Sequence, residues 1–158
     1  MLFNELARIT PIERWPTPEV SAVEVDDENA VLADFIQMNS AIALSERSRV
    51  ALRDLIESAG EVLPLRHRLQ QLWVYHVLAV NDVFHREKSE YEVFASSGRV
   101  KAISRFVMHG GEIADGVQVF RPKGVEWAGI IVSESFKDRV ETLGLSGCIF
   151  VPIELVDV

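Results

Sequence analysis

The sequence predicts an α+β protein of one domain, in which a mixed β-sheet carries two serine-capped helices in strand–helix–strand units. Three observations support this class. The chain has 158 residues, the length of one domain with a substantial core. Short β-rich runs alternate with two amphipathic helical patterns. No low-complexity linker divides the chain, so residues 1–158 are expected to form a single unit.

The first 30 residues are the least regular part of the chain. Pro11, Pro16 and Pro18 surround Trp15. Because proline restricts its own backbone and that of the residue before it, this spacing disfavours a helix. We expect residues 1–30 to form an irregular extended segment that wraps the body of the protein.

The first strand–helix–strand unit is expected over residues 44–65. Ser45 is placed to cap a helix of about residues 46–59, because its hydroxyl accepts from unpaired N–H groups of the first turn. Gly60 follows the last residue of the pattern and is expected to end the helix. The apolar stripe of this helix comprises Leu52, Leu55, Ile56 and Ala59.

Several strands are expected in the middle of the chain. The run 71–80 is rich in branched and aromatic residues, which favours a strand buried on both faces. Further strands are expected at 91–94, 99–108 and 116–120, and they are separated by charged or glycine-containing turns.

The second unit is expected over residues 128–153. A strand at 128–132 leads to Ser133, which is placed to cap a second helix. Gly144 ends this helix because glycine readily adopts the left-handed conformation of a helix stop. The remaining expected features are an apolar helix face of Phe136, Val140 and Leu143, and a return strand from Cys148 to Val151 that ends at Pro152.

The two units align at a constant offset of 88 positions, without a gap. Ser45 aligns with Ser133, and Pro64 aligns with Pro152. Two interpretations compete, namely an internal duplication and two independent solutions to capping the same kind of unit. We expect the same structure in both places, and common descent stays open.

The charge balance limits the classes of partner. The chain has 16 basic and 24 acidic residues, a net charge of −8, which disfavours nucleic acid and anionic membranes. Glu5 and Arg8 interrupt the apolar core that a signal peptide needs. The longest uncharged run, 69–81, is too short for a membrane-spanning helix, which takes about 20 residues. A cytoplasmic location is therefore expected.

The sequence contains no recognisable catalytic or metal motif. His67, His76 and His85 are each nine residues apart, and an odd separation places strand side chains on opposite faces. The single cysteine, Cys148, lies in an apolar run and is expected to be an inert buried thiol. We expect no metal, no cofactor and no catalytic residues.

Four blocks of the sequence carry a family resemblance. They are GEVLPL at 60–65, VLAVNDVFHREKSEY at 77–91, QVFRP at 118–122 and IIVSESFKDRVETLGLSGCIFVPI at 130–153. In order and spacing, these blocks resemble the DUF1629 family, also called Imm11, predicted immunity proteins of bacterial polymorphic toxin systems. The resemblance covers residues 40–155, and the last block is its most specific part.

The resemblance implies a small, non-catalytic α+β protein that binds a cognate toxin domain and blocks it. An interface of this kind centres on aromatic or Arg anchors inside a polar rim. If the toxin is basic, binding should weaken as salt increases. The candidate toxin-binding residues are Asp26, Asp27, Glu28, Asp82, Glu87, Glu90, Glu92, Trp15 and Trp127.

Two hypotheses from other classes remain open. One is a small ligand-binding protein or enzyme with a pocket near His76 and Asp82. It predicts loss of turnover, with folding intact, when Asp82 is changed. The other is a homodimer joined through an edge strand such as the one ending at Pro152.

Overall fold

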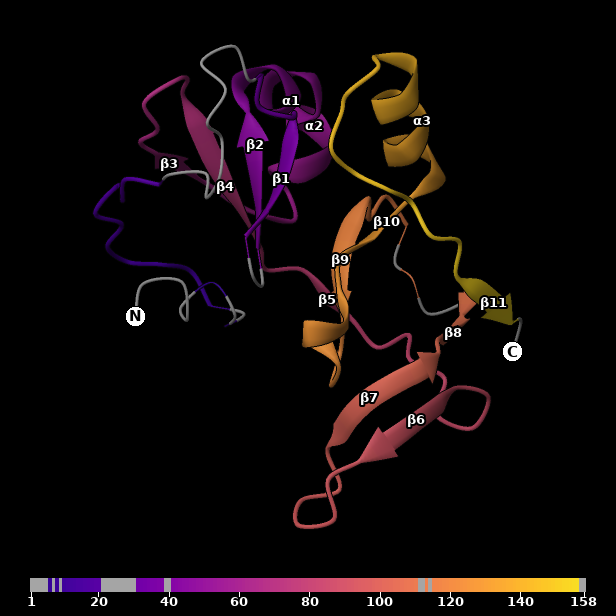
Figure 1. Cartoon of the computed structure of the whole chain (residues 1–158). Helices are drawn as coiled ribbons and strands as arrows, with labels where there is room; N and C mark the ends of the chain where they lie inside the picture. Colours follow the sequence, from indigo (N-terminus) through magenta and orange to yellow (C-terminus); the bar gives the residue numbers. More distant parts are fainter. Residues whose placement is uncertain are drawn as a thin grey trace.

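The computed structural model describes residues 6, 8, 10–20, 31–38, 41–110, 113 and 115–156. It combines helices and strands, so the predicted α+β class is confirmed (Figure 1). The elements in chain order are β1 (Phe35–Met38), β2 (Ala41–Ser45), α1 (Glu46–Ala51), α2 (Arg53–Ile56), β3 (Gly60–Leu65), β4 (Leu72–Val77), β5 (Val80–Asn81), β6 (Glu90–Val93), β7 (Val100–Arg105), β8 (Val107–His109), β9 (Val119–Pro122), the 3₁₀ turn η3 (Glu126–Ala128), β10 (Ile131–Val132), α3 (Glu134–Thr142) and β11 (Glu154–Val156).

The described strands form four sheets rather than one shared sheet, and the sheet of β10, β9 and β5 is the mixed one. The largest sheet is antiparallel, in the order β1-β2-β4-β3. The others are β10-β9-β5, β11-β8 and β6-β7. The expected strand at 99–108 splits at Phe106, because β7 pairs with β6 whereas β8 pairs with β11. Phe106 packs against two core clusters at this junction.

The four-stranded sheet is covered on both faces. One face packs against a core that residues of all three α-helices contact, among them Ala51, Ile56 and Val140. A second core on β2 and β4 is covered by side chains of the N-terminal segment. The central strand β4 is therefore buried on both faces, as its composition predicted.

The described part of the N-terminal segment, residues 10–20, runs along the sheet as predicted. The Trp15 indole Nε1–H donates to the Pro64 carbonyl at 2.6 Å. The Val20 N–H donates to the Arg66 carbonyl at 2.8 Å, and the Arg66 N–H donates to the Pro18 carbonyl at 3.0 Å. These bonds fix an extended segment beside β3.

In the first unit the cap is confirmed and the helix stop is not. Ser45 Oγ accepts from the Ser48 N–H at 3.1 Å, at the start of α1. The helix is interrupted at Leu52, which is fully buried, so α1 and α2 replace the one expected helix. Gly60 is wrong as a helix stop, because it is the first residue of β3. A Cβ at Gly60 would lie 2.2 Å from the His76 carbonyl oxygen, so close pairing of β3 with β4 requires glycine.

In the second unit both ends of the helix are confirmed. Ser133 Oγ accepts from the Phe136 N–H at 3.1 Å. Gly144 has φ of +59°, and the Gly144 and Leu145 N–H groups donate back to Glu141 and Val140, which is a Schellman stop. Leu143 is wrong as a member of the buried face, because it lies beyond the last helical turn and is 43% exposed.

The strands of the second unit differ from the prediction. Residues 126–128 form η3 and Gly129 has φ of +144°, so only β10 remains of the strand expected at 128–132. Residues 148–151 form no strand, and no described strand pairs with them, although Cys148 and Phe150 pack against the main core. The shared structure of the two units is thus the strand end, the serine cap and the helix that follows it, and the return strand is not shared.

The two units are joined through Asp34. Its carboxylate accepts from Ser45 Oγ at 2.7 Å, the Ser146 N–H at 3.0 Å and the Arg47 guanidinium at 3.1 Å. Burial opposes ionisation, but the hydrogen bonds of both serines and the charge of Arg47 outweigh it. The pKa of Asp34 therefore lies below its ordinary value.

Candidate protein-binding surface

Residues 82–105, here called the arm, contain four of the candidate toxin-binding residues. The arm comprises a charged connection followed by the β6–β7 hairpin, which projects from the rest of the chain (Figure 1). One face of the hairpin packs on a small core of Phe84, Val100 and Val125, with Tyr91 against it. An anchored but projecting hairpin is a suitable shape for reaching into a partner.

The structure brings Asp82 beside the loop that carries Trp127. The Lys123 ammonium lies 3.3 Å from Asp82 Oδ2. The Arg86 guanidinium lies 3.7 Å from the point where a Cβ of Gly124 would be. Trp127, three residues further along, is 53% exposed. Two candidates 45 positions apart in the sequence therefore flank one junction at the base of the arm.

Arg86 is a feature of this junction that sequence reasoning missed. Its guanidinium carbon lies 5.8 Å from the Phe84 ring centroid and 6.0 Å from that of Tyr91, within the range of a cation–π contact. Trp, Tyr and Arg are the residue types most enriched at binding hot spots. The sequence signal was an arginine between two aromatic residues, Phe84 and Tyr91, in a short connection.

The candidate residues Asp82, Glu87, Glu90 and Glu92 do not give the arm a net negative charge. The Glu92 carboxylate lies 3.3 Å from the Lys101 ammonium, and Glu90 interacts with the charge of Arg105. Together with Lys123 on Asp82, these cations balance the carboxylates. The arm contains five cations of its own: Arg86, Lys88, Arg99, Lys101 and Arg105.

Exposed apolar side chains complete the surface. Val93 and Phe94, at the end of β6, are about half exposed. With Trp127 they are large apolar groups in water on a unit rich in charged residues. An apolar centre with a polar rim is the usual composition of a specific protein interface.

The other candidate binding residues lie elsewhere. Asp26, Asp27 and Glu28 fall outside the described residues. Trp15 is half-buried, and its indole N–H is used in the fold. The described residues hold 17 acidic and 16 basic side chains, so most of the net charge of −8 belongs to positions outside them.

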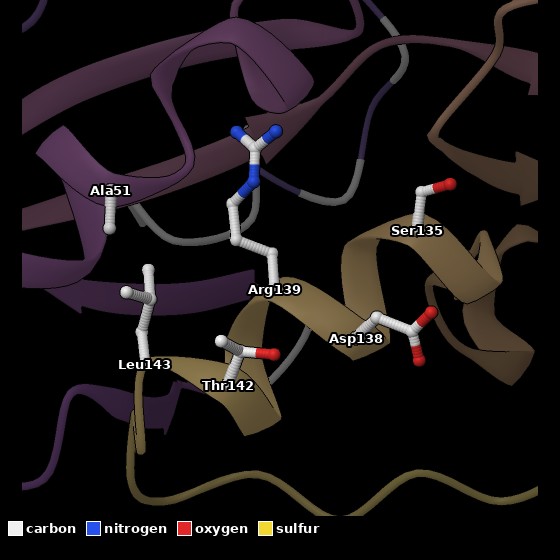
Figure 2. A pocket seen from close by; sticks show the side chains of 6 residues that line it. All are labelled: Ala51, Ser135, Asp138, Arg139, Thr142 and Leu143. Atoms are coloured by element: carbon white, nitrogen blue, oxygen red, sulfur yellow. The ribbon is translucent and has the colours of Figure 1, made fainter.

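A groove of about 620 Å³ lies between the first helices and α3 (Figure 2). Ala51 and Leu143 face each other at one end, and Arg139 extends toward α1 and α2, where it pairs with Asp54. The groove is lined by Ala51, Ser135, Asp138, Arg139, Thr142 and Leu143. These six residues include neither a histidine nor a pair of carboxylates, so they offer no recognisable general acid–base pair.

His76 and Asp82, the proposed pocket residues, do not share an environment. His76 is fully buried, with Nδ1 3.2 Å from Glu61 Oε2 and Nε2 2.6 Å from the Arg8 carbonyl. It is the hydrogen-bonded core histidine that its position in β4 suggests. Asp82 is exposed and paired with Lys123.

The remaining reactive groups form no cluster. The rings of His85 and His109 stack with centroids 4.1 Å apart, but among the described residues no three His, Cys, Asp or Glu side chains converge as metal ligands do. Burial raises the pKa of the Cys148 thiol, and the charges of Asp34 and Glu141 raise it further. Within the described ranges no helix is long and apolar enough to cross a membrane.

No protein-family model matches the chain, and no curated protein matches it.

Proposed function

We propose that the protein is an immunity protein, which binds a cognate bacterial toxin domain in the cytoplasm of the producing cell and neutralises it by occlusion. The sequence blocks that resemble the Imm11 family support this proposal. The structural observation that carries it is the arm junction, where Arg86, in cation–π contact with Tyr91, lies beside Gly124 of the loop that carries exposed Trp127. Neither Trp127 nor the Arg86–Tyr91 contact belongs to a cluster of reactive side chains among the described residues.

Occlusion requires the partner's active surface to be covered, and it requires no reaction by this chain. A standard interface buries about 800 Å² on each partner, roughly 20 to 30 residues. The arm, with its adjoining loop at 123–128, is long enough to supply such a patch. Trp127 and Arg86 are its expected anchors, while the paired charges Asp82–Lys123 and Glu92–Lys101 lie at its rim.

The test is co-purification with the product of an adjacent reading frame that encodes a C-terminal toxin domain. Trp127→Ala and Arg86→Ala should each raise the Kd at least tenfold, because truncating a hot-spot residue costs about 2 kcal/mol or more. Val50→Ala is the control, since Val50 is also exposed but lies on α1. Unchanged affinity in both variants would remove the arm and its adjoining loop from the interface. Failure to co-purify would contradict the immunity role.

The salt dependence of association separates two parts of the proposal. Charges on the arm are nearly balanced, so binding through the arm alone should have an on-rate that changes little between low and high salt. A steep decrease with salt would instead indicate that Asp26, Asp27 and Glu28 contact a basic partner. Reversing these three charges would then abolish the salt dependence.

The alternative of a pocket near His76 and Asp82 has no observation in its favour. Both ring nitrogens of His76 are occupied and the ring has no exposed surface. We therefore do not adopt a ligand-binding or enzymatic function for this pair.

A further inference from the structure

A pocket of about 280 Å³ lies at the turn that joins β3 to β4. Its volume is close to the lower end of the range for small-molecule sites, about 300 Å³. One wall is the turn itself, and the other contains Glu19, whose neighbours Pro18 and Val20 are hydrogen-bonded to the backbone of Arg66. The lining residues are Glu19, Arg66, His67, Arg68, Gln70 and Gln71. All six are polar, which suits a small polar ligand.

The pocket has positive charge to spare, although the chain has a net charge of −8. Two guanidinium groups line it against one carboxylate, that of Glu19. The exposed Arg68 side chain has no hydrogen bond or ion pair with any described residue. Arg66 Nε donates to the Thr17 carbonyl at 3.2 Å, which leaves its two terminal nitrogens unused by the described residues. Guanidinium groups with spare donors are suited to bind an oxyanion.

Two further side chains of the pocket supply donors. His67 Nδ1 accepts from the Leu69 N–H at 3.2 Å, so the proton of the neutral ring is on Nε2, which can donate. Gln70 Nε2 is shielded from water and is the one buried side-chain nitrogen or oxygen in the described chain without a hydrogen-bond partner. Half a turn of this amide exchanges its nitrogen and oxygen, and Nε2 can then donate to an acceptor in the pocket. A ligand oxygen would satisfy it.

The walls of the pocket are fixed by hydrogen bonds. Gln71 Nε2 donates to the carbonyl oxygens of Leu65 at 3.0 Å and Leu72 at 2.7 Å, which closes the turn between the two strands. In the opposite wall, Thr17 has φ of +52° and is the only non-glycine residue of the described chain with a positive φ. Its carbonyl holds Arg66 Nε. Strained backbone of this kind persists where the surrounding structure fixes it, commonly at ligand sites.

We propose that this pocket binds a small phosphate monoester, with its phosphate on Arg66 and Arg68 and a hydroxyl group of its alcohol part on Glu19. A phosphate monoester has nearly two negative charges at neutral pH and three terminal oxygens. These oxygens match two guanidinium groups, His67 Nε2–H and the Gln70 amide better than the two oxygens of a carboxylate do. The Glu19 carboxylate repels an anion but accepts from a hydroxyl group, so it contacts the alcohol part.

Isothermal titration of the full chain with glycerol 3-phosphate, inorganic phosphate and glycerol at low salt tests the proposal. We expect a Kd on the order of 0.1 mM for glycerol 3-phosphate, about tenfold weaker binding of inorganic phosphate, and no binding of glycerol. Arg68→Gln should raise the Kd of glycerol 3-phosphate at least tenfold. Arg99→Gln is the matched control, because Arg99 is also exposed and without an ion pair in the described chain but lies in the β6–β7 turn. No binding at about 10 mM glycerol 3-phosphate would overturn the proposal, and so would equal binding by the two variants.

The position and orientation of the ligand have their own tests. In NMR titrations with glycerol 3-phosphate, the backbone amides of residues 66–71 and the side-chain amide of Gln70 should shift, and shifts confined to other residues would contradict the site. Glu19→Ala should remove the preference for glycerol 3-phosphate over inorganic phosphate, and a preference that persists would contradict the role of Glu19. Because β3 and β4 lie apart from the arm (Figure 1), Trp127→Ala should leave phosphate binding unchanged. This proposal and the toxin-binding proposal can therefore fail separately.

Discussion

The two serine-capped units, 44–65 and 132–153, start in the same way and finish differently. Each begins with a serine whose hydroxyl accepts from the N–H group three residues later. In the first unit the chain returns as β3 and pairs along its whole length with β4. In the second it returns as a segment that pairs with no strand among the described residues and has Ile149 in water. Local chemistry determines where a helix begins, but a strand forms only where a partner is present.

The largest expected effect on stability is at Gly60, which aligns with Cys148 at the position where the two units differ most. Gly60→Ala places a Cβ 2.2 Å from the His76 carbonyl oxygen, so β3 must move away from β4. We expect a loss of about 3 kcal/mol or more in the free energy of unfolding, measured by urea denaturation. Cys148→Ala, at the aligned position, should cost about 1 kcal/mol. Equal losses at both positions would contradict the difference in pairing.

The connection between the units should be the next most sensitive point. Asp34→Ala removes the acceptor that Ser45, Arg47 and Ser146 share in the interior. We expect a loss of about 2–4 kcal/mol, since hydrogen bonds to a charged group contribute about 1.5–3 kcal/mol. A loss below about 0.5 kcal/mol, the usual size for a surface substitution, would show that Asp34 does not join the units.

The same carboxylate predicts a pH dependence. The folded pKa of Asp34 lies below the unfolded value of about 3.9, so the unfolded state takes up the proton first. The stabilisation is therefore present above about pH 4 and is lost as the pH falls below it toward the folded pKa. Urea midpoints of Asp34→Asn should change less over this acidic range than those of the unmodified chain. Parallel pH profiles would contradict the assignment.

The two N-cap serines, Ser45 and Ser133, offer a direct comparison between the units. Ser45 is buried and also donates to Asp34, whereas Ser133 is partly exposed. We expect Ser45→Ala to cost about 2 kcal/mol and Ser133→Ala about 1 kcal/mol, within the range for N-cap serines. Thermal unfolding of the two variants side by side measures the difference, and the reverse order would be inconsistent with the role of Asp34.

The smallest effect is expected at Val151, which aligns with Leu63 of β3. Leu63 packs against the second core, so Leu63→Lys should cost about 2 kcal/mol. Val151→Lys should change the free energy of unfolding by less than about 0.5 kcal/mol, because the side chain is already in water. Urea denaturation of the two variants measures the difference.

Features set by neighbouring residues were predictable from the sequence. Ser45, Ser133 and Gly144 act within one helical turn, and all three have the expected roles. Gly60 does not, because the reason for glycine there is the distant carbonyl of His76. The division into four sheets also depends on pairings between distant segments, which no local pattern encodes.

The candidate site shows the same division. Exposed Trp127 was identified from residue type, but the loop that carries it lies beside Asp82 because β5 pairs with β9. In the sequence the carboxylates of the arm suggested negative charge, because Lys123, which balances Asp82, lies 41 positions away. Arg86 was missed because its aromatic contacts form only when the connection folds back on itself.

Amide hydrogen exchange compared between residues 60–65 and 148–153 tests the difference between the units most directly. The paired amides of β3 should be protected, and those of residues 148–153 should exchange close to the unstructured rate. Strong protection of residues 148–153 would contradict the account, because it would mean that these residues already have a partner within their own chain.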